Sequence, residues 1–334
     1  MILRELFARK KILVVGDSIL DRYVYGKVTR VSPEAPVPVV VKQEEKIFPG
    51  GAANVAQNVV SLGAEVHLLS ICGDDENGEI LQRICQKKKI VQTFIIDSRP
   101  TTTKIRIIGN NHQIARIDEE RTHPIEKSIE DKIFSVFQNL VSTTDLVILQ
   151  DYGKGIFNES LSQRIIKEAS RVGVEVIVDP KDKDLKKFRG SFLIKPNLSE
   201  LKLISGIPQD HDLSEEQIVE ISRNIIKQHK VSMVLVTLSE NGMILVTEHS
   251  ITKKPGLKIE VSDVSGAGDT VSATLGLCLA SGVSNRDCVA ICNLAGSIVC
   301  QFSGAVPINS KHLFDKLAKI SPLLESTDGS AILI

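Results

Sequence analysis

Residues 263–275 read DVSGAGDTVSATL, with Gly266 and Gly268 standing between the carboxylates Asp263 and Asp269. The apolar spacing after Asp269 predicts a helix, so the two glycines lie in its first turn. A glycine inside a helix costs about 1 kcal/mol relative to alanine, and neighbouring carboxylates repel each other. The stretch therefore indicates a site at which a close-lying ligand compensates for poor helix chemistry.

The first turn of such a helix is suited to binding an anion. Its N–H groups have no intrahelical acceptor and lie at the positive end of the helix dipole. Glycine lets a phosphate approach the backbone, and Asp269 is placed to accept the proton of an attacking hydroxyl. This predicts a phosphoryl-transfer site. The equally weighted alternative is that Asp269 only complements the dipole and the glycines only form a tight turn.

Composition limits the classes of partner. The 334 residues include 41 basic and 41 acidic side chains, so the net charge is zero, which argues against nucleic acid or an anionic membrane as partner. A small anionic substrate needs only a local site. We find no apolar run of membrane-spanning length and no secretory signal pattern. The six cysteines form no C-x-x-C pair, which favours reduced thiols in a cytoplasmic protein.

Short apolar runs alternate with helical patterns along most of the chain. This alternation predicts an α/β fold with a mostly parallel central sheet and helices on both faces. Ligands of such sheets bind beyond the carboxyl ends of the strands, where Asp17, Asp151, Asp179 and Asn197 stand. Strands are expected at 11–17, 65–71, 145–151, 174–180, 191–196 and 232–238, and helices near 52–62, 77–88, 125–140, 158–172, 197–204 and 214–229.

Two segments, 22–48 and 101–118, break the alternation. Three prolines exclude a helix from the first, and a Gly-Asn-Asn turn predicts a hairpin in the second. Both lie between core elements, so we expect a small β-sheet lid within a single domain spanning 1–334. Proline-rich lid strands with exposed edges suggest a homodimer formed through the lids. The tail at 325–334 is expected to be loosely held.

Two further motifs have both structural and functional interpretations. In FPGGAANVAQNVVSLGAEV (48–66), Gly50 and Gly51 precede a helix of small residues from which Asn54 can reach a sugar hydroxyl; the alternative is a well-packed helix with a glycine entry turn. In KPNLSELKLI (195–204), Asn197 and Glu200 fit a capping box. They also fit a strand-end pair that organises the water shell of Mg²⁺ and nucleotide phosphates.

Taken together, PGGAANVAQNVVSLGA, KPNLSE and DVSGAGD resemble the ribokinase-like (PfkB) carbohydrate kinases over essentially the whole chain. The resemblance implies a three-layer sandwich with a β-lid and ATP-dependent transfer to a sugar hydroxyl. Within the family, GDSILDRYVYGKVTRVSPEAPVPVV, DYGKG and DPK are most similar to kinases of heptose 7-phosphate. These phosphorylate the anomeric C1 hydroxyl of D-glycero-D-manno-heptose 7-phosphate to the 1,7-bisphosphate, on the route to ADP-heptose and the lipopolysaccharide core.

The resemblance also implies roles for single residues on the phosphate side. Asp269 matches the catalytic base, and Gly266, Ala267 and Gly268 match the anion hole. Glu200 is implied to hold Mg²⁺ through water. The nucleotide-binding turn of the family usually has a glycine where Ser239 stands, which leaves the backbone geometry there open. The residues that match ATP-binding positions are Asn197, Leu198, Ser199, Glu200, Thr237, Gly242 and Asn293.

A second group of residues concerns the sugar. Asp263 and Ser265 match part of a monovalent-cation (K⁺) site of some relatives. The candidates for a substrate phosphate are Lys154, Lys181 and Arg106; alternatively, one of them serves ATP and the others are solvated. The remaining sugar-binding candidates are Asp17, Asp21, Gly50, Gly51, Asn54 and Asp151.

Three hypotheses stay open at this point. The first is a heptose 7-phosphate kinase, and the second is the same chemistry on another sugar or sugar phosphate. The third is a sugar-binding regulator without turnover, against which the intact Asp269 and glycine cradle argue. Many relatives carry a second, cytidylyltransferase-like domain; no such sequence follows here, and both a stand-alone kinase and an excised domain are compatible with that.

Overall fold

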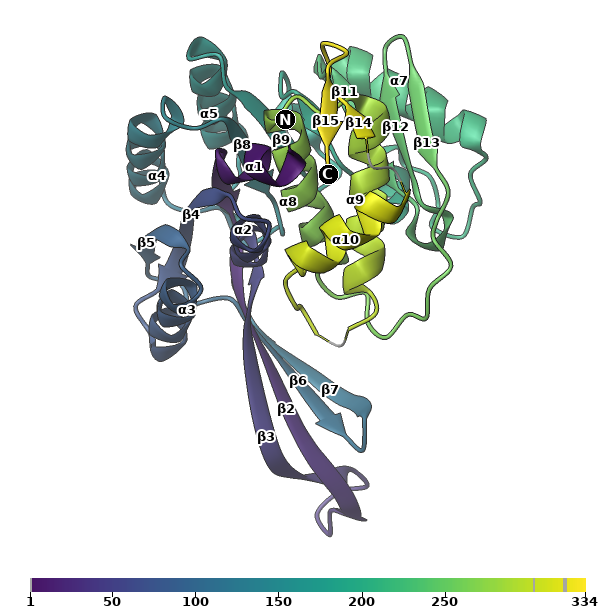
Figure 1. Cartoon of the computed structure of the whole chain (residues 1–334). Helices are drawn as coiled ribbons and strands as arrows, with labels where there is room; N and C mark the ends of the chain where they lie inside the picture. Colours follow the sequence, from purple (N-terminus) through teal and green to yellow (C-terminus); the bar gives the residue numbers. More distant parts are fainter. Residues whose placement is uncertain (1, 303, 321–322) are drawn as a thin grey trace.

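The computed structural model describes residues 2–302, 304–320 and 323–334. A central sheet is covered by helices on both faces, and a second, smaller sheet projects from one end of this body (Figure 1). The strands of the central sheet are β1 (Lys11–Gly16), β4 (Glu65–Gly73), β5 (Val91–Asp97), β8 (Leu146–Gln150), β9 (Glu175–Asp179), β10 (Leu193–Ile194), β11 (Met233–Thr237), β12 (Met243–Thr247) and β13 (Ile251–Lys254).

The central sheet is mostly parallel. Its strand order is β13-β12-β11-β10-β9-β8-β1-β4-β5, and every neighbouring pair from β11 to β5 is parallel. The two antiparallel pairs of this sheet, β11–β12 and β12–β13, lie at one end of it. The six strands expected from the apolar runs are all present, whereas β5, β12 and β13 were not foreseen.

The helices form two layers. One layer consists of α1 (Leu3–Ala8), α2 (Ala52–Ser61), α3 (Glu76–Lys87), α8 (Ala267–Ala280), α9 (Asn285–Val299) and α10 (Ser310–Ile320). The other consists of α4 (Lys127–Val141), α5 (Glu159–Arg171), α6 (Leu198–Ile204) and α7 (Glu215–His229). Two short 3₁₀ turns, η1 (Leu185–Phe188) and η2 (Ser239–Asn241), complete the helical elements of the described residues.

Each face of the sheet has its own hydrophobic core. In β1, Ile12 and Val14 belong to the core under the first helix layer, while Leu13 and Val15 belong to the other. Successive side chains of a strand point to opposite faces, so a strand covered on both sides is apolar throughout. This explains why the strands could be recognised as continuous apolar runs.

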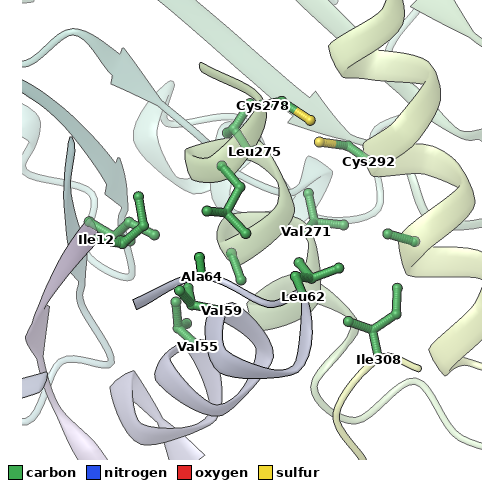
Figure 2. Close-up of a cluster of buried hydrophobic side chains, with 14 of the residues drawn as sticks. Ile12, Val55, Val59, Leu62, Ala64, Val271, Leu275, Cys278, Cys292 and Ile308 are labelled. Carbon is green, nitrogen blue, oxygen red and sulfur yellow. The ribbon is translucent and has the colours of Figure 1, made fainter. Parts of the chain in front are cut away.

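The core under α2, α8 and α9 is made of small and branched side chains. Figure 2 shows Val55 and Val59 of α2 on the side that packs against α8, near Leu275. Cys278 of α8 points toward Cys292 of α9 in the same core (Figure 2). All six cysteines are free and five are buried, in agreement with the expectation of reduced core thiols.

The projecting sheet is the expected lid. Its strands are β2 (Ser18–Val31), β3 (Pro38–Gly51), β6 (Thr103–Gly109) and β7 (His112–Glu119), in the order β3-β2-β6-β7. The strands extend a few residues beyond the predicted segments because β2 and β3 continue down to the edge of the main body (Figure 1). Asn110 and Asn111 have φ of 51° and 67°, as the predicted hairpin turn requires.

The expectation of a loosely held tail is wrong. Residues 325–334 take part in a hairpin of β14 (Leu323–Glu325) and β15 (Ala331–Leu333). Leu324 and Ile332 are buried in the core under the first helix layer. The mostly polar segment 325–334 gave no sign of this packing, because Ile332 is its one buried side chain in this core.

Candidate active site

The order in which strands are added to the sheet changes direction at β1. The chain continues from β1 to β4 and β5 on one side, whereas β8 and the later strands lie on the other. Such a reversal opens a crevice at the carboxyl ends of the strands. Asp17 follows β1, Gln150 ends β8, Asp179 ends β9 and Lys195 follows β10. The first turn of α8 reaches the same edge, since Asp269 accepts a hydrogen bond from Gln150.

Asp269 is buried and held by three neutral donors. Its Oδ2 accepts a hydrogen bond from Asn54 Nδ2 at 2.7 Å. Its Oδ1 accepts one from the Tyr152 hydroxyl at 2.7 Å and one from Gln150 Nε2 at 3.3 Å. An ionised carboxylate has about four acceptor positions, two on each oxygen. Oδ2 therefore keeps an acceptor position for a further donor, such as a substrate hydroxyl.

The surroundings of Asp269 raise its pKa to about 7. Burial is the largest cause, and the negative charge of Asp179 adds to it. The hydrogen bonds from Tyr152 and Asn54 and the positive charge of Lys195 act in the opposite direction. A carboxylate with a pKa near neutrality is suited to general base catalysis, because it is available as base and still takes up a proton readily.

Gly266 is required where α8 begins. It is the N-cap residue and has a φ of +78°, a conformation that favours glycine. A Cβ at this position would lie 2.7 Å from the Asn54 side-chain nitrogen. The glycine thus allows α8 to start beside Asn54, which in turn holds Asp269.

The first turn of α8 leaves two backbone donors available. The N–H of Ala267 donates to the carbonyl of Val264. The N–H groups of Gly268 and Asp269 have no acceptor among the described residues. A Cβ added to Gly268 would have a single contact within 4 Å, the Nζ of Lys195 at 4.0 Å. An open space is therefore bordered by two N–H groups and an ammonium group, which suits a phosphoryl group.

Lys195 was not identified from the sequence, although it opens the motif at 195–204. Its Nζ pairs with the carboxylate of Asp179 at 2.9 Å, and both side chains are largely buried. Burial is the largest influence and would lower the pKa of Lys195, but the charge and hydrogen bond of Asp179, together with the charges of Glu200 and Asp269, raise it overall. Gln150 and Ser272 also donate to Asp179, so this pair is fixed on all sides. The position of Lys195 at the end of a predicted strand was the signal that could have identified it.

On the opposite side, two glycines let the lid strands approach the sheet. A Cβ at Gly50 would lie 2.2 Å from Oδ2 of Asp21, and one at Gly51 would lie 2.2 Å from the backbone oxygen of Asp17. Gly51 also has a φ of +59°. Asp21 forms an ion pair with Arg106 of β6 at 2.5 Å, so the guanidinium proposed for a substrate phosphate already has a partner.

Asp17 is a second buried carboxylate with neutral donors. Its Oδ2 accepts hydrogen bonds from the backbone N–H groups of Tyr152 at 2.8 Å and Lys154 at 3.1 Å. Its Oδ1 is buried without a hydrogen-bond partner in the described part of the chain. Burial and the nearby charge of Asp151 raise the pKa of Asp17 to about 6. Oδ1 is therefore a position at which a ligand hydroxyl would satisfy a buried acceptor.

Basic side chains gather beside Asp17. Lys154 and Arg121 line the same small pocket as Asp17, and Lys154 pairs with Glu120 at 2.7 Å. Burial and the positive charge of Lys154 lower the pKa of Lys104. Lys104 and Arg121 were not identified from the sequence; only the fold brings the loop after β7, which carries Arg121, to this pocket.

At the start of α6, the capping box predicted as an alternative is present. Asn197 Oδ1 accepts from the N–H of Glu200 at 2.8 Å, and Glu200 Oε2 accepts from the N–H of Asn197 at 2.9 Å. Glu200 Oε1 pairs with Lys181 at 3.0 Å, so the ammonium group of Lys181 lies with this motif. Leu198 packs against the second core, and the Ser199 hydroxyl donates to a glutamine side chain of the following loop.

The expected nucleotide turn keeps its backbone geometry. Ser239, at the position usually taken by glycine, has a φ of +52°, and Gly242 has a φ of +88°. Thr237 lies beside Asn197 in an isolated bridge between neighbouring chain segments. Asn293 of α9 donates its side-chain amide to a backbone carbonyl before α8 at 2.8 Å. The fold thus brings Thr237 next to the strand-end motif.

The two aspartates that flank the glycines have separate partners. Asp263 accepts backbone N–H groups of Ser265 at 2.8 Å and Gly304 at 2.9 Å. Burial would raise the pKa of Asp263, but these hydrogen bonds outweigh it and lower the pKa. The close spacing in the sequence is therefore resolved by turning Asp263 toward the backbone and Asp269 toward the crevice.

Asp151 has structural contacts. Its Oδ1 accepts the N–H of Gly153 and its Oδ2 pairs with the buried Lys187, both at 2.8 Å. Both oxygens are thus used within the protein.

Within the described ranges, no three histidine, cysteine or acidic side chains are grouped so as to hold a metal. None of the helices described is both long and apolar enough to cross a membrane.

Comparison with known proteins agrees with this geometry. A family model described as pfkB family carbohydrate kinase matches residues 9–311. Bifunctional protein HldE of a Nitratiruptor species is 41% identical over 298 residues, which cover 89% of this chain and 63% of that protein. Bifunctional protein HldE of Coxiella burnetii (strain Dugway 5J108-111) is 37% identical over 327 residues, covering 95% and 66%. The chain thus spans only about two thirds of the length of these relatives.

Solved structures show the same fold. Phosphofructokinase-2 from Escherichia coli in complex with potassium has a TM-score of 0.79 at 17% identity, covering 94% of this chain and 99% of that one. Ribokinase from Arabidopsis thaliana complexed with ribose and ATP has a TM-score of 0.69 at 20% identity, covering 91% and 98%. The three-layer arrangement with a projecting β-lid is therefore that of the ribokinase-like kinases.

Proposed function

The chain belongs to the pfkB family of carbohydrate kinases, and we propose that it transfers a phosphoryl group from ATP to the anomeric hydroxyl of D-glycero-D-manno-heptose 7-phosphate. One observation carries the phosphoryl transfer. Asp269, whose pKa is raised to about 7, lies beside the open space between two backbone N–H groups and Lys195. The heptose assignment rests on the resemblance of the lid and DYGKG segments and on the similarity to the HldE proteins.

The reaction follows from these contacts. The sugar hydroxyl donates its hydrogen bond to Oδ2 of Asp269, which takes the proton as the oxygen attacks the γ-phosphorus. A new P–O bond forms, the bond to the bridging oxygen breaks, and ADP leaves with the electron pair. The N–H groups of Gly268 and Asp269, together with Lys195, stabilise the charge on the transferring phosphoryl group.

ATP and Mg²⁺ are assigned to the side of Asn197, Glu200, Thr237 and Gly242. Mg²⁺ usually keeps several waters and contacts one or two carboxylates and the substrate phosphates, so a preformed cage of protein ligands is not required. The single carboxylate of Glu200 fits that donor set. The metal would supply charge neutralisation on the phosphates; Glu200 would orient its waters.

We assign the substrate phosphate to the basic group of Lys154, Lys104 and Arg121. The support is that Lys154 and Arg121 share a pocket with Asp17. Lys154, Lys181 and Arg106 each pair with a carboxylate, Glu120, Glu200 and Asp21 respectively, so the place of Lys154 in this pocket carries the assignment. A charge-assisted contact of about 1.5–3 kcal/mol implies that Lys154→Met raises KM for the sugar phosphate roughly ten- to a hundredfold.

The deciding experiment is an ADP-release assay with heptose 7-phosphate, the unphosphorylated heptose and other sugar phosphates. Preference for heptose 7-phosphate supports the full proposal. Preference for another sugar phosphate keeps the kinase and replaces the substrate, which is the second candidate function. Lys181→Met serves as the matched control for Lys154→Met, and its KM for the sugar phosphate should stay unchanged.

A potassium requirement and a homodimer complete the proposal. Asp263 already accepts two backbone N–H groups, so no step is derived through K⁺; comparing rates in potassium and choline salts tests the requirement. The lid exposes Val41 on β3 and Ile117 on β7, the two edge strands, which supports association through the lids in a cytoplasmic enzyme. Light scattering of Ile117→Lys should give a monomer if the lids form the interface.

A further inference from the structure

Tyr152 contacts both buried carboxylates of the crevice. Its backbone N–H donates to Oδ2 of Asp17 at 2.8 Å, and its hydroxyl donates to Oδ1 of Asp269 at 2.7 Å. Asp17 and Asp269 belong to segments more than two hundred residues apart in sequence. One residue of the loop after β8 therefore connects the sugar side of the crevice with the base.

The loop that carries Tyr152 is itself fixed. The N–H of Gly153 donates to Asp151 at 2.8 Å, and Gly153 has a φ of +67°. Arg99 donates to the carbonyl of Lys154 at 2.9 Å. A Cβ at Gly155 would lie 2.1 Å from a backbone oxygen, so the chain is tightly packed there. These contacts fix the backbone of the loop from which the phenol ring extends to the base.

We propose that Tyr152 is a positioning residue that orients the carboxylate of Asp269 for proton abstraction. By occupying Oδ1 together with Gln150, the hydroxyl leaves Oδ2 as the oxygen that meets the substrate. The inference rests on the proposed function only in that Asp269 is the base. Tyr152 itself does not take the proton, since it acts as donor.

The charges around the pair agree with that role. Burial and the negative charge of Asp269 raise the pKa of Tyr152 well above its usual value, so the hydroxyl keeps its proton. The groups that face the pair are Asp179 at the end of β9, Lys195 after β10 and Asp21 on β2. Without the hydroxyl, Asp269 would lose one of the hydrogen bonds that favour its ionised form.

The test is the pH profile of Tyr152→Phe, which removes one oxygen and keeps the ring. We expect kcat to fall roughly tenfold and the acidic limb of kcat/KM to move up by roughly one pH unit. KM for ATP should stay unchanged. In an Asp269→Asn background, Tyr152→Phe should cause no further loss, because the hydroxyl acts through the carboxylate. Tyr25→Phe, on the lid, is the matched control.

A second measurement does not depend on the variant folding well. The chain has three tyrosines, so 3-fluorotyrosine can replace all of them, and its more acidic hydroxyl is a stronger donor. The acidic limb should then move to lower pH, and this shift should be absent from Tyr152→Phe. An unmoved limb in both experiments, or a raised KM for the sugar alone, would overturn the proposal. If Asp269→Asn stays active, the proposed base is wrong, which is a separate outcome.

Discussion

Four aspartates lie at the carboxyl edge of the sheet, and they fall into two pairs. Asp151 and Asp179 are each bound by a buried lysine, Lys187 and Lys195, at 2.8 and 2.9 Å. Asp17 and Asp269 have only neutral groups among the direct hydrogen-bond donors in the described residues.

This difference suggests two roles: the lysine-bound pair is structural, and the pair with neutral donors belongs to the proposed catalytic site. A lysine in contact supplies a counter-charge to a buried carboxylate, and the pair connects neighbouring segments. Neutral donors compensate a buried carboxylate only in part, so burial raises the pKa of Asp17 to about 6 and that of Asp269 to about 7. The incompletely compensated pair lies at the crevice, as expected if buried carboxylates with raised pKa values mark a functional site.

The largest effect should come from removing the base. Asp269→Asn keeps the shape but cannot accept the proton, so kcat should fall by about 10² to 10⁴ while ATP and sugar binding are largely kept. Steady-state kinetics and calorimetric binding measure the two. Asp131→Asn, a surface change on α4, is the control. A variant within threefold of the wild-type kcat would exclude Asp269 as the base.

Breaking a compensated pair should instead damage stability. Lys187→Met removes the counter-charge of the buried Asp151. We therefore expect the free energy of unfolding to fall by about 3–5 kcal/mol. Chemical denaturation measures it. The double variant Lys187→Met/Asp151→Leu should recover much of that loss, because no unpaired charge remains. Equal stability of wild type and Lys187→Met would show that the pair does not hold the scaffold.

Asp269→Asn should also change how stability depends on pH. The pKa of Asp269 is raised from 3.8 to about 7, so its contribution to stability is complete below pH 3.8 and is lost as the pH rises to 7. At pH 8 the free energy of unfolding of the variant should therefore exceed that of the wild type by up to about 4 kcal/mol. A lost hydrogen bond reduces this gain by about 1 kcal/mol. Denaturation of both proteins at pH 5 and 8 tests this; a difference independent of pH would contradict the raised pKa.

The smallest effect is expected at Glu200, whose lysine partner Lys181 is more than half exposed. If Glu200 orients the Mg²⁺ shell, Glu200→Gln should raise the Mg²⁺ concentration for half-maximal rate several-fold. If it is only a helix cap, stability should fall by up to about 1 kcal/mol and the Mg²⁺ dependence should remain. A Mg²⁺ titration beside a melting curve distinguishes the two.

Much of this site could be predicted because its residues lie in short local motifs. Gly266 and Asp269 are separated by one helical turn, and Asn197 and Glu200 cap one helix, so their spacing alone predicts their relation. The strand end at Asp17 was recognisable from the apolar run before it. Side chains that depend on several segments, such as Tyr152, were not identified.

Local patterns in the chain specify the alternation of strands and helices, the lid segments and the glycine turn of α8, because these depend on periodicity and backbone chemistry. Which charges meet is a property of the tertiary structure. It placed Lys181 on Glu200 and Lys154 beside Asp17. It also gave each of the four aspartates compared above either a lysine or neutral donors. The physical reason is that a pKa and an ion pair depend on burial and on distances between segments remote in sequence, which no local pattern encodes.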